Sequence, residues 1–147
     1  MDRRYLAVFS TALIIIFIDQ IAKFLIKANF QLNQTLPVIN NIFHLTYIHN
    51  FGAGFGILQQ QRWILAFISI IVIGFIFYYL DRINNKERVL QLLTGFILGG
   101  TIGNLIDRVI YGYVTDFLDF RIWPVFNFAD SFVTVGAIGL IIYFWKK

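Results

Sequence analysis

The chain has 147 residues, of which 59% are hydrophobic and only 14% are charged, and its mean hydropathy is +0.73. Soluble domains usually contain about 25% charged residues, so a water-soluble globule of this size would lack polar surface. The net charge is +4, but the basic residues punctuate apolar runs and form no patch of the kind that binds nucleic acid. The absence of cysteine excludes disulfides and thiolate sites, and two histidines are too few for a His-rich metal site. We therefore expect an α-helical integral membrane protein with one domain over residues 1–147.

Residues 5–26 form the first expected transmembrane helix. A short basic leader precedes this apolar run, and no small-residue cleavage site follows it, so we interpret it as a retained helix and not as a signal peptide. Asp19 and Lys23 lie four residues apart and therefore share one helical face. Two interpretations stay open. The ion pair either makes two charges tolerable near the membrane interface, or it supports a polar site at the same depth in the membrane.

The mixed segment 28–62 is expected to contain two short strands, at residues 35–39 and 42–48. Asn40 and Asn41 lie between them, and asparagine tolerates the positive φ of a tight hairpin. His44 and His49 are interpreted as polar loop residues and not as metal ligands.

Three glycines follow within residues 50–56. They serve either an ordinary loop or a close approach of the backbone to a bound molecule.

Three further apolar stretches are long enough to cross a bilayer at about 1.5 Å per residue. They are residues 63–80, 89–106 and 126–145. In the second, Gly95, Gly99 and Gly103 recur every four positions, which predicts a smooth face for close helix packing. Four transmembrane helices are therefore expected.

Polar residues gather near the ends of the last two helices. Asn104, Asp107 and Arg108 share one face at the end of the third, which favours a functional polar cluster. Asp116 lies in a short extended piece, and Asp130 stands near the start of the last helix. A carboxylate at the mouth of a membrane helix is costly, which favours a functional role for both acids.

Seven basic residues lie on one side of the four helices, namely Arg3, Arg4, Arg82, Lys86, Arg88, Lys146 and Lys147. The other side carries Lys27, Arg62, Arg108 and Arg121. Because basic residues favour the cytoplasm, both termini are expected to face it, and the two acids are expected at the outer face.

Two carboxyl groups in one site do not ionise together readily, so one keeps its proton and the pair can activate a water molecule. Hydrolysis of a peptide bond by such a pair needs no cysteine, serine or metal. Other readings stay open: a Mg²⁺ or Ca²⁺ site, a proton relay in a carrier, a helix-capping role for Asp130, and a non-enzymatic assembly partner.

Five motifs resemble, in order, those of the lipoprotein signal peptidases, also called signal peptidase II. They are DQIAK at residues 19–23, NFGAGF at 50–55, GGTIGNLIDR at 99–108, VTDF at 114–117 and FNFADS at 126–131. One such motif is weak, but five in order over almost the whole chain are specific.

The resemblance implies an aspartic protease that cuts a bacterial prolipoprotein on the amino side of a cysteine carrying diacylglycerol. It implies that Asp116 and Asp130 form the catalytic dyad and that no cofactor or metal is needed. It further implies a set of residues that shape the site or contact substrate: Asp19, Lys23, Asn50, Gly52, Asn104, Arg108, Asn127 and Ala129. It also implies a small outer-face β-sheet that cradles the lipoprotein, an extracytoplasmic loop, and apolar helices that hold the acyl chains.

The resemblance places the protein in the bacterial cytoplasmic membrane. The expected partners are the lipid-modified prolipoprotein and membrane lipid, without nucleic acid, and the expected state is a monomer. The sequence departs from the family pattern at Ala22, Gly54 and Thr101. All three residues are small, so we expect adjusted packing and retained activity.

Overall fold

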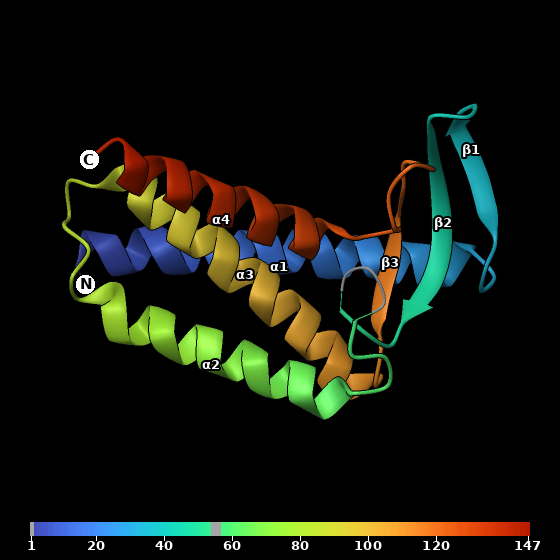
Figure 1. Cartoon of the computed structure of the whole chain (residues 1–147), viewed down its shortest axis with the longest axis horizontal. Helices are drawn as coiled ribbons and strands as arrows, with labels where there is room; N and C mark the ends of the chain where they lie inside the picture. Colours follow the sequence, from blue (N-terminus) through green and yellow to red (C-terminus); the bar gives the residue numbers. More distant parts are fainter. Residues whose placement is uncertain (1, 54–56) are drawn as a thin grey trace.

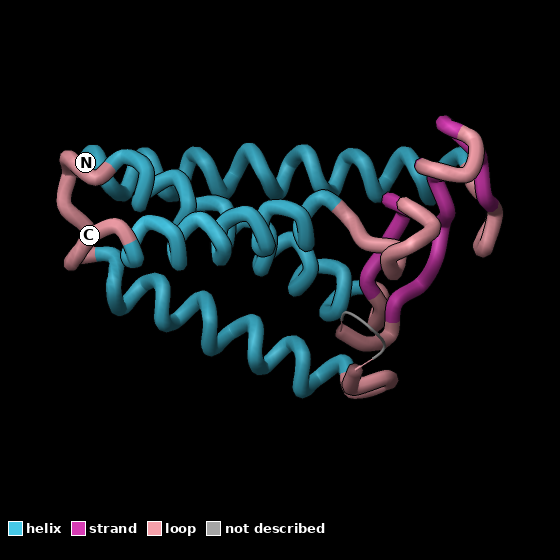
Figure 2. The backbone as a smooth tube through the Cα atoms, turned by 45° about the horizontal axis from the view of Figure 1, so that its top comes forward, coloured by secondary structure: helices cyan, strands magenta, loops and turns pink. Residues whose placement is uncertain are grey.

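The computed structural model describes residues 2–53 and 57–147. Four helices lie along one another, a three-stranded sheet covers one end of them, and both chain ends lie at the opposite end (Figure 1). Figure 2 shows the same division, with every strand gathered at one end of the helices. The elements are α1 (Arg3–Asn29), β1 (Thr35–Ile39), β2 (Phe43–Asn50), α2 (Arg62–Leu80), α3 (Arg88–Ile110), β3 (Val114–Asp119) and α4 (Phe128–Trp145).

All four helices are long and apolar enough to cross a membrane, with mean hydropathies between 1.6 and 2.5 over their most apolar windows. The prediction of an α-helical membrane protein with four spans and a small sheet is therefore confirmed. Helix α3 is the central helix, because α1, α2 and α4 all pack against it. It is also the helix with the largest buried share.

Three helices differ from the sequence-based boundaries by two residues or more. Helix α1 extends from Arg3 to Asn29, beyond the expected residues 5–26. Helix α3 continues to Ile110 instead of ending at residue 106, because the polar side chains that interrupt the apolar run find partners inside the protein. Helix α4 begins at Phe128 and not at residue 126, since Asn127 caps it and Phe126 pairs with Leu118 of β3.

The sheet is antiparallel, with strand order β1-β2-β3. Asn41 adopts a φ of 60° in the turn between β1 and β2, as predicted for this hairpin. Strand β2 is longer than expected and ends at Asn50, which pairs with Val114 of β3.

Both histidines lie on β2, so their interpretation as loop residues is wrong. His44 falls inside the strand predicted at residues 42–48, whereas His49 lies beyond its expected end. His49 stacks on the ring of Tyr113 with 3.6 Å between ring centroids, and its Nε2 lies 2.9 Å from the hydroxyl of Tyr47. His44 pairs with Asp119 in the register between β2 and β3. Alternating polarity in this stretch therefore indicated a strand correctly, and the histidines belong to it.

The glycines of α3 allow close helix packing, as predicted. A methyl group at Gly95 would meet Thr11 of α1, and one at Gly99 would meet the backbone of Ala12. At Gly103 it would lie 2.8 Å from a carboxylate oxygen of Asp19. The stripe therefore brings α1 and its polar residues against α3.

Gly100, one position beside the stripe, makes the corresponding contact with α4. A methyl group there would overlap the carbonyl oxygen of Ala129 and the side chain of Val133. Gly100→Ala is therefore expected to push α4 away from α3 and to destabilise the protein by about 1–3 kcal/mol. Thermal unfolding in detergent measures this effect.

Gly74→Ala is the matched control for Gly100→Ala. A methyl group at Gly74 on α2 has no heavy atom within 4 Å, so this change should leave the unfolding temperature the same or slightly higher. Equal losses in the two variants would show that the contact between α3 and α4 is not the cause.

Candidate active site

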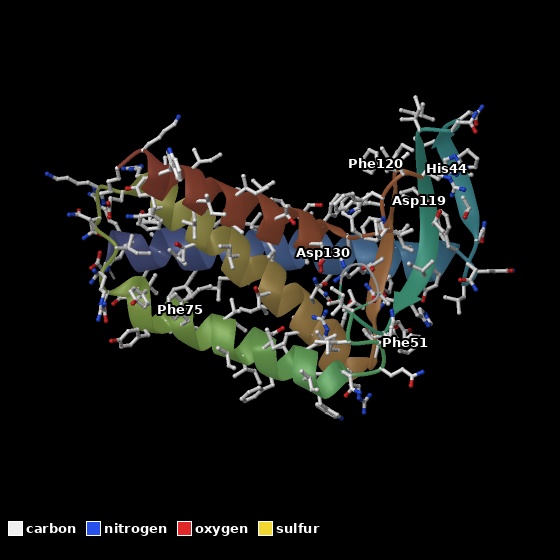
Figure 3. All side chains as sticks on the ribbon, in the orientation of Figure 1. His44, Phe51, Phe75, Asp119, Phe120 and Asp130 are labelled. Carbon is white, nitrogen blue, oxygen red and sulfur yellow. The ribbon has the colours of Figure 1, made fainter. Side chains whose placement is uncertain are left out.

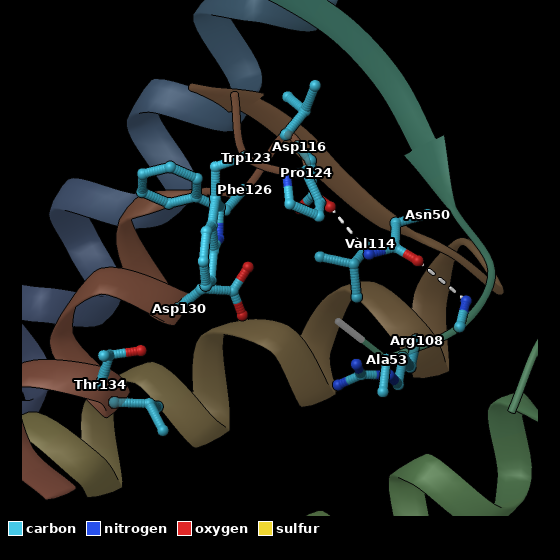
Figure 4. A pocket seen from close by; sticks show the side chains of 13 residues that line it. Asn50, Ala53, Arg108, Val114, Asp116, Trp123, Pro124, Phe126, Asp130 and Thr134 are labelled. Carbon is cyan, nitrogen blue, oxygen red and sulfur yellow. Dashed lines mark hydrogen bonds between the residues drawn. The ribbon is translucent and has the colours of Figure 1, made fainter. Parts of the chain in front are cut away.

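Asp116 and Asp130 line one cavity of about 230 Å³ where the sheet meets the helices (Figure 4). Asp116 comes from the middle of β3, and Asp130 comes from the first turn of α4. Figure 3 shows Asp130 at the end of α4 that faces the sheet. The structure therefore brings together the two acids that the sequence singles out.

Two asparagines connect the acids. The side-chain amide of Asn127 donates to Oδ1 of Asp116 at 2.6 Å and to Oδ1 of Asn104 at 3.1 Å. The side-chain amide of Asn104 donates to Oδ1 of Asp130 at 2.7 Å. These bonds hold both carboxyl groups in fixed orientations toward the same cavity.

Asp130 also takes part in capping α4. Asn127 is the N-cap: its Oδ1 accepts the backbone N–H of Asp130 at 2.8 Å, and Asp130 Oδ2 accepts the N–H of Asn127 at 3.4 Å. This reciprocal pair satisfies two donors at the helix start. The capping role considered for Asp130 is thus present, and it fixes the carboxyl group at the edge of the cavity.

Asn50 reaches the site from the end of β2. Its side-chain amide donates to Oδ2 of Asp116 at 2.8 Å, and its Oδ1 accepts the backbone N–H of Gly52 at 2.9 Å (Figure 4). Gly52 is buried, and a methyl group there would lie 2.8 Å from the carbonyl oxygen of Ile57. A close backbone approach therefore requires glycine at position 52, whereas Gly54 lies outside the described residues.

Lys23 on α1 is fully buried. Its Nζ lies 2.7 Å from Asp19 and 3.1 Å from Asp107, and it donates to Oδ1 of Asn104 at 3.0 Å. Both acids are fully buried as well. The Asp19–Lys23 pair is therefore no isolated ion pair, because it joins a buried network that reaches the cavity through Asn104.

The same network holds the backbone next to each cavity acid. Asp107 Oδ2 accepts the N–H of Thr115 at 3.0 Å, and Thr115 immediately precedes Asp116. Asp19 Oδ1 accepts the N–H of Ala129 at 2.9 Å, and Ala129 immediately precedes Asp130. Lys23 thus joins two carboxylates, each of which fixes the chain one residue before a cavity acid.

Arg108 lines the cavity from α3 (Figure 4). Its only hydrogen bond within the described part of the chain is a long one, 3.5 Å from Nη1 to the carbonyl oxygen of Asn104, and it forms no ion pair there. Since a guanidinium has five N–H donors, most of them stay available to a bound molecule.

Burial raises the pKa of Asp116 from 3.8 to about 7, and the nearby charge of Asp130 acts in the same direction. The hydrogen bonds from Asn50 and Asn127 oppose the rise. A carboxyl group with this pKa exchanges its proton near neutral pH, which suits acid and base catalysis.

The structure brings every predicted site residue into one connected cluster. Sequence reasoning placed Asp107 in a polar cluster but missed its bonds to Lys23 and to the backbone of Thr115. Its spacing from Asn104 in the motif at residues 99–108 was the only available signal. Two of the three residues that depart from the family pattern lie in the described part of the chain. Ala22 packs against the buried cluster of Ile26, Tyr47 and Phe117, and Thr101 is half-buried on α3.

The fold and the cavity define a membrane-spanning protein with two carboxyl groups that face one cavity at a membrane-helix end. The sequence model described as signal peptidase (SPase) II matches residues 11–146. The lipoprotein signal peptidase of Halothermothrix orenii is 47% identical over 95% of this chain and 96% of its own length. The one from Moorella thermoacetica is 46% identical over 86% and 85%.

A solved structure described as a bacterial membrane enzyme has a TM-score of 0.86 and 31% sequence identity, and the match covers 95% of this chain and 87% of that one. A second with the same description has a TM-score of 0.83 and 30% identity, over 95% and 93%. The chain belongs to the signal peptidase II family, whose known role is the processing of prolipoprotein signal peptides by an aspartic protease.

Proposed function

We propose that the protein removes the signal peptide from diacylglyceryl-modified prolipoproteins and that Asp116 and Asp130 are its catalytic dyad. The observation that carries this proposal is the pair of carboxyl groups on one cavity, bridged by Asn127 and Asn104. The bond cut is the peptide bond on the amino side of the lipidated cysteine. This cavity takes the scissile bond, while the substrate's acyl chains stay among the apolar helices.

In the reaction, the dyad holds one shared proton, mainly at Asp116. Asp130 takes a proton from a water molecule, whose oxygen attacks the scissile carbonyl carbon, while Asp116 gives its proton to the carbonyl oxygen. The C–N bond then breaks: Asp130 gives its proton to the leaving cysteine nitrogen, and one hydroxyl of the tetrahedral intermediate gives its proton back to Asp116 as the carbonyl re-forms. Arg108, with donors that face the cavity, binds a carbonyl oxygen of the substrate.

The supporting residues act on the acids and not on the substrate bond. Asn50, Asn104 and Asn127 orient the carboxyl groups through the hydrogen bonds given above. Asp19 and Lys23 fix the backbone beside them, and Gly52 and Ala129 fill positions where the backbone packs closely. The protein works as a monomer surrounded by membrane lipid.

The orientation follows from charge. Arg3, Arg4, the basic residues of the loop between α2 and α3, and the two C-terminal lysines lie at the end away from the cavity (Figure 1). Since basic residues favour the cytoplasmic side, both termini face the cytoplasm and the cavity lies near the outer face of the cytoplasmic membrane.

The function is tested by incubating the purified full-length protein with a prolipoprotein that carries diacylglycerol on its cysteine, and with the same prolipoprotein without lipid. Mass spectrometry identifies the products. We expect a cut before the cysteine of the lipidated substrate and little or no cut without lipid. Cleavage at other bonds, or equal cleavage of both substrates, would contradict the proposal.

The pKa of Asp116 predicts how the rate depends on pH. Because this pKa is raised to about 7, the dyad keeps its shared proton below that pH and loses it as the pH rises. The value of kcat/KM is therefore expected to fall as the pH increases through about 7. Initial rates on the lipidated substrate measure this. A rate that rises steadily into the alkaline range would assign catalysis to a different group.

A further inference from the structure

A strongly apolar cavity lies away from the dyad, between α2 and α4. It has a volume of about 590 Å³, and α3 forms its floor. Helices α2 and α4 each pack on α3 on different sides of it (Figure 1), which leaves a groove where they face each other. Its apolar walls come from Val72, Phe75 and Ile76 of α2, Leu90 and Ile97 of α3, and Leu140 of α4.

This groove is separate from the proposed active site. Leu140 lies ten residues after Asp130 on the same helix, which is about 15 Å at 1.5 Å per residue. Figure 3 shows Phe75 and Asp130 at different levels along the helices, with Phe75 toward the chain ends. The scissile bond of a substrate in the dyad cavity therefore lies outside the groove.

The polar end of the groove carries Arg82, Lys147 and Glu87. Glu87 is already engaged, because it pairs with Lys147 at 2.6 Å and accepts the hydroxyl of Tyr143 at 2.9 Å. The bonds from Lys147, from the backbone N–H of Asn84 and from Tyr143 lower the pKa of Glu87 to about 2, so its carboxyl group is ionised at neutral pH. Among the side chains that line the groove, two basic groups and one acid leave a net positive charge at this end.

Arg82 has the environment of an anion-binding arginine. Its guanidinium lies over the rings of Tyr78 and Tyr79, 5.0 and 4.7 Å from their centroids, and donates one hydrogen bond to the hydroxyl of Tyr78. Within the described residues it forms no ion pair. Stacking on aromatic rings holds the planar group in place, and its other N–H donors suit the oxygens of a phosphate.

We propose that the groove between α2 and α4 binds an anionic glycerophospholipid, with an acyl chain along the apolar walls and the phosphate at Arg82 and Lys147. The surroundings support this occupant, because the helices that form the groove are apolar enough to span a membrane. Phe75 and Phe144 on its two sides are 60% and 58% exposed, so the groove opens toward the surrounding acyl chains. A polar or purely soluble ligand would not match these walls.

Native mass spectrometry of the delipidated full-length protein in detergent tests the proposal. Phosphatidylglycerol and phosphatidylcholine with identical acyl chains are titrated separately, and the bound fraction is measured for each. A basic residue near a membrane surface favours an anionic lipid by about fivefold. We therefore expect tighter binding of phosphatidylglycerol, by about fivefold or more. Equal binding of the two lipids would overturn the proposal.

Variants separate this site from general attraction to a basic surface. Arg82→Gln should lose about fivefold in affinity for phosphatidylglycerol, whereas Lys86→Gln, which removes the same charge from the same loop outside the groove, should not. Leu140→Trp should reduce binding of both lipids by filling the groove. Equal losses from Arg82→Gln and Lys86→Gln, or unchanged binding by Leu140→Trp, would refute the groove as the site.

Asp116→Asn should bind phosphatidylglycerol as the wild type does, because the groove is distant from the dyad. This control makes the two proposals independent. An inactive protein that still selects the anionic lipid would leave the groove proposal intact. If Asp116→Asn loses the selectivity, the lipid preference arises from the dyad cavity and the groove proposal is wrong.

Discussion

Asp116→Asn and Asp130→Asn are each expected to reduce kcat for prolipoprotein cleavage by roughly 10²–10⁴-fold, the usual contribution of a positioned acid or base. An amide of the same shape neither takes a proton from water nor gives one to the carbonyl oxygen. The double variant should lose little more than either single variant, because the two groups act as one unit. Single-turnover cleavage of the lipidated substrate measures each loss.

Folding must be measured beside activity for these variants. Both oxygens of Asp116 accept hydrogen bonds from side-chain amides, those of Asn50 and Asn127. An asparagine at position 116 replaces one carboxylate oxygen with an amide NH₂ group. That group would face the NH₂ donor of Asn50 or Asn127, and the lost hydrogen bond costs some stability. Asp119→Asn is the matched control, since this carboxyl lies on the same strand but binds Thr46 and Arg121 outside the cavity. A folded Asp116 or Asp130 variant with near-normal turnover would refute the dyad.

Lys23→Met is expected to destabilise the protein by about 3–5 kcal/mol, because it leaves the buried charges of Asp19 and Asp107 without a partner. Activity should fall as well, since those two acids hold the backbone before Asp130 and Asp116. Thermal unfolding and cleavage rates measure the two effects. Lys86→Met, at an exposed position, should change neither.

A triple variant separates charge from packing. Asp19→Asn and Asp107→Asn, added to Lys23→Met, remove the unpaired charges while each asparagine oxygen still accepts its backbone N–H. Much of the lost stability should then return. If the triple variant is as unstable as Lys23→Met alone, lost packing around the lysine stem causes the instability and the charge argument is wrong.

The four helices could be predicted from the sequence because each apolar run is long enough to span a bilayer, and the one competing interpretation, a signal peptide at residues 5–26, lacked a cleavage site. Their ends were harder to predict. The end of α3 depends on Asp107, whose partners Lys23 and Thr115 come from α1 and β3. The start of α4 is set by Asn127, which caps the helix, and by Phe126 just before it, which pairs with Leu118 of β3. Such boundaries are set by contacts between distant segments and not by local hydrophobicity.

The site was predictable as a set of residues but not as a network. Family motifs singled out Asp116, Asp130 and the residues around them, and the structure brings these into one cluster. No spacing in the sequence indicates that Asn127 lies between Asp116 and Asn104, or that His49 stacks on Tyr113. Those pairings arise from the register of β2 and β3 and from the way α4 follows them.

Asp107 and Asp19 hold the backbone N–H groups of Thr115 and Ala129. Residues 120–125 therefore connect two segments whose backbone is held in place. Trp123, Pro124 and Val125 in this connection line the dyad cavity, whereas the carboxylates of the Lys23 network bind the backbone at Thr115 and Ala129, outside it. Its length and side chains can therefore diverge in evolution while the spacing of the two acids stays the same. Changes in this one short loop can therefore alter which substrates fit the cavity, while Asp116 and Asp130 keep their positions.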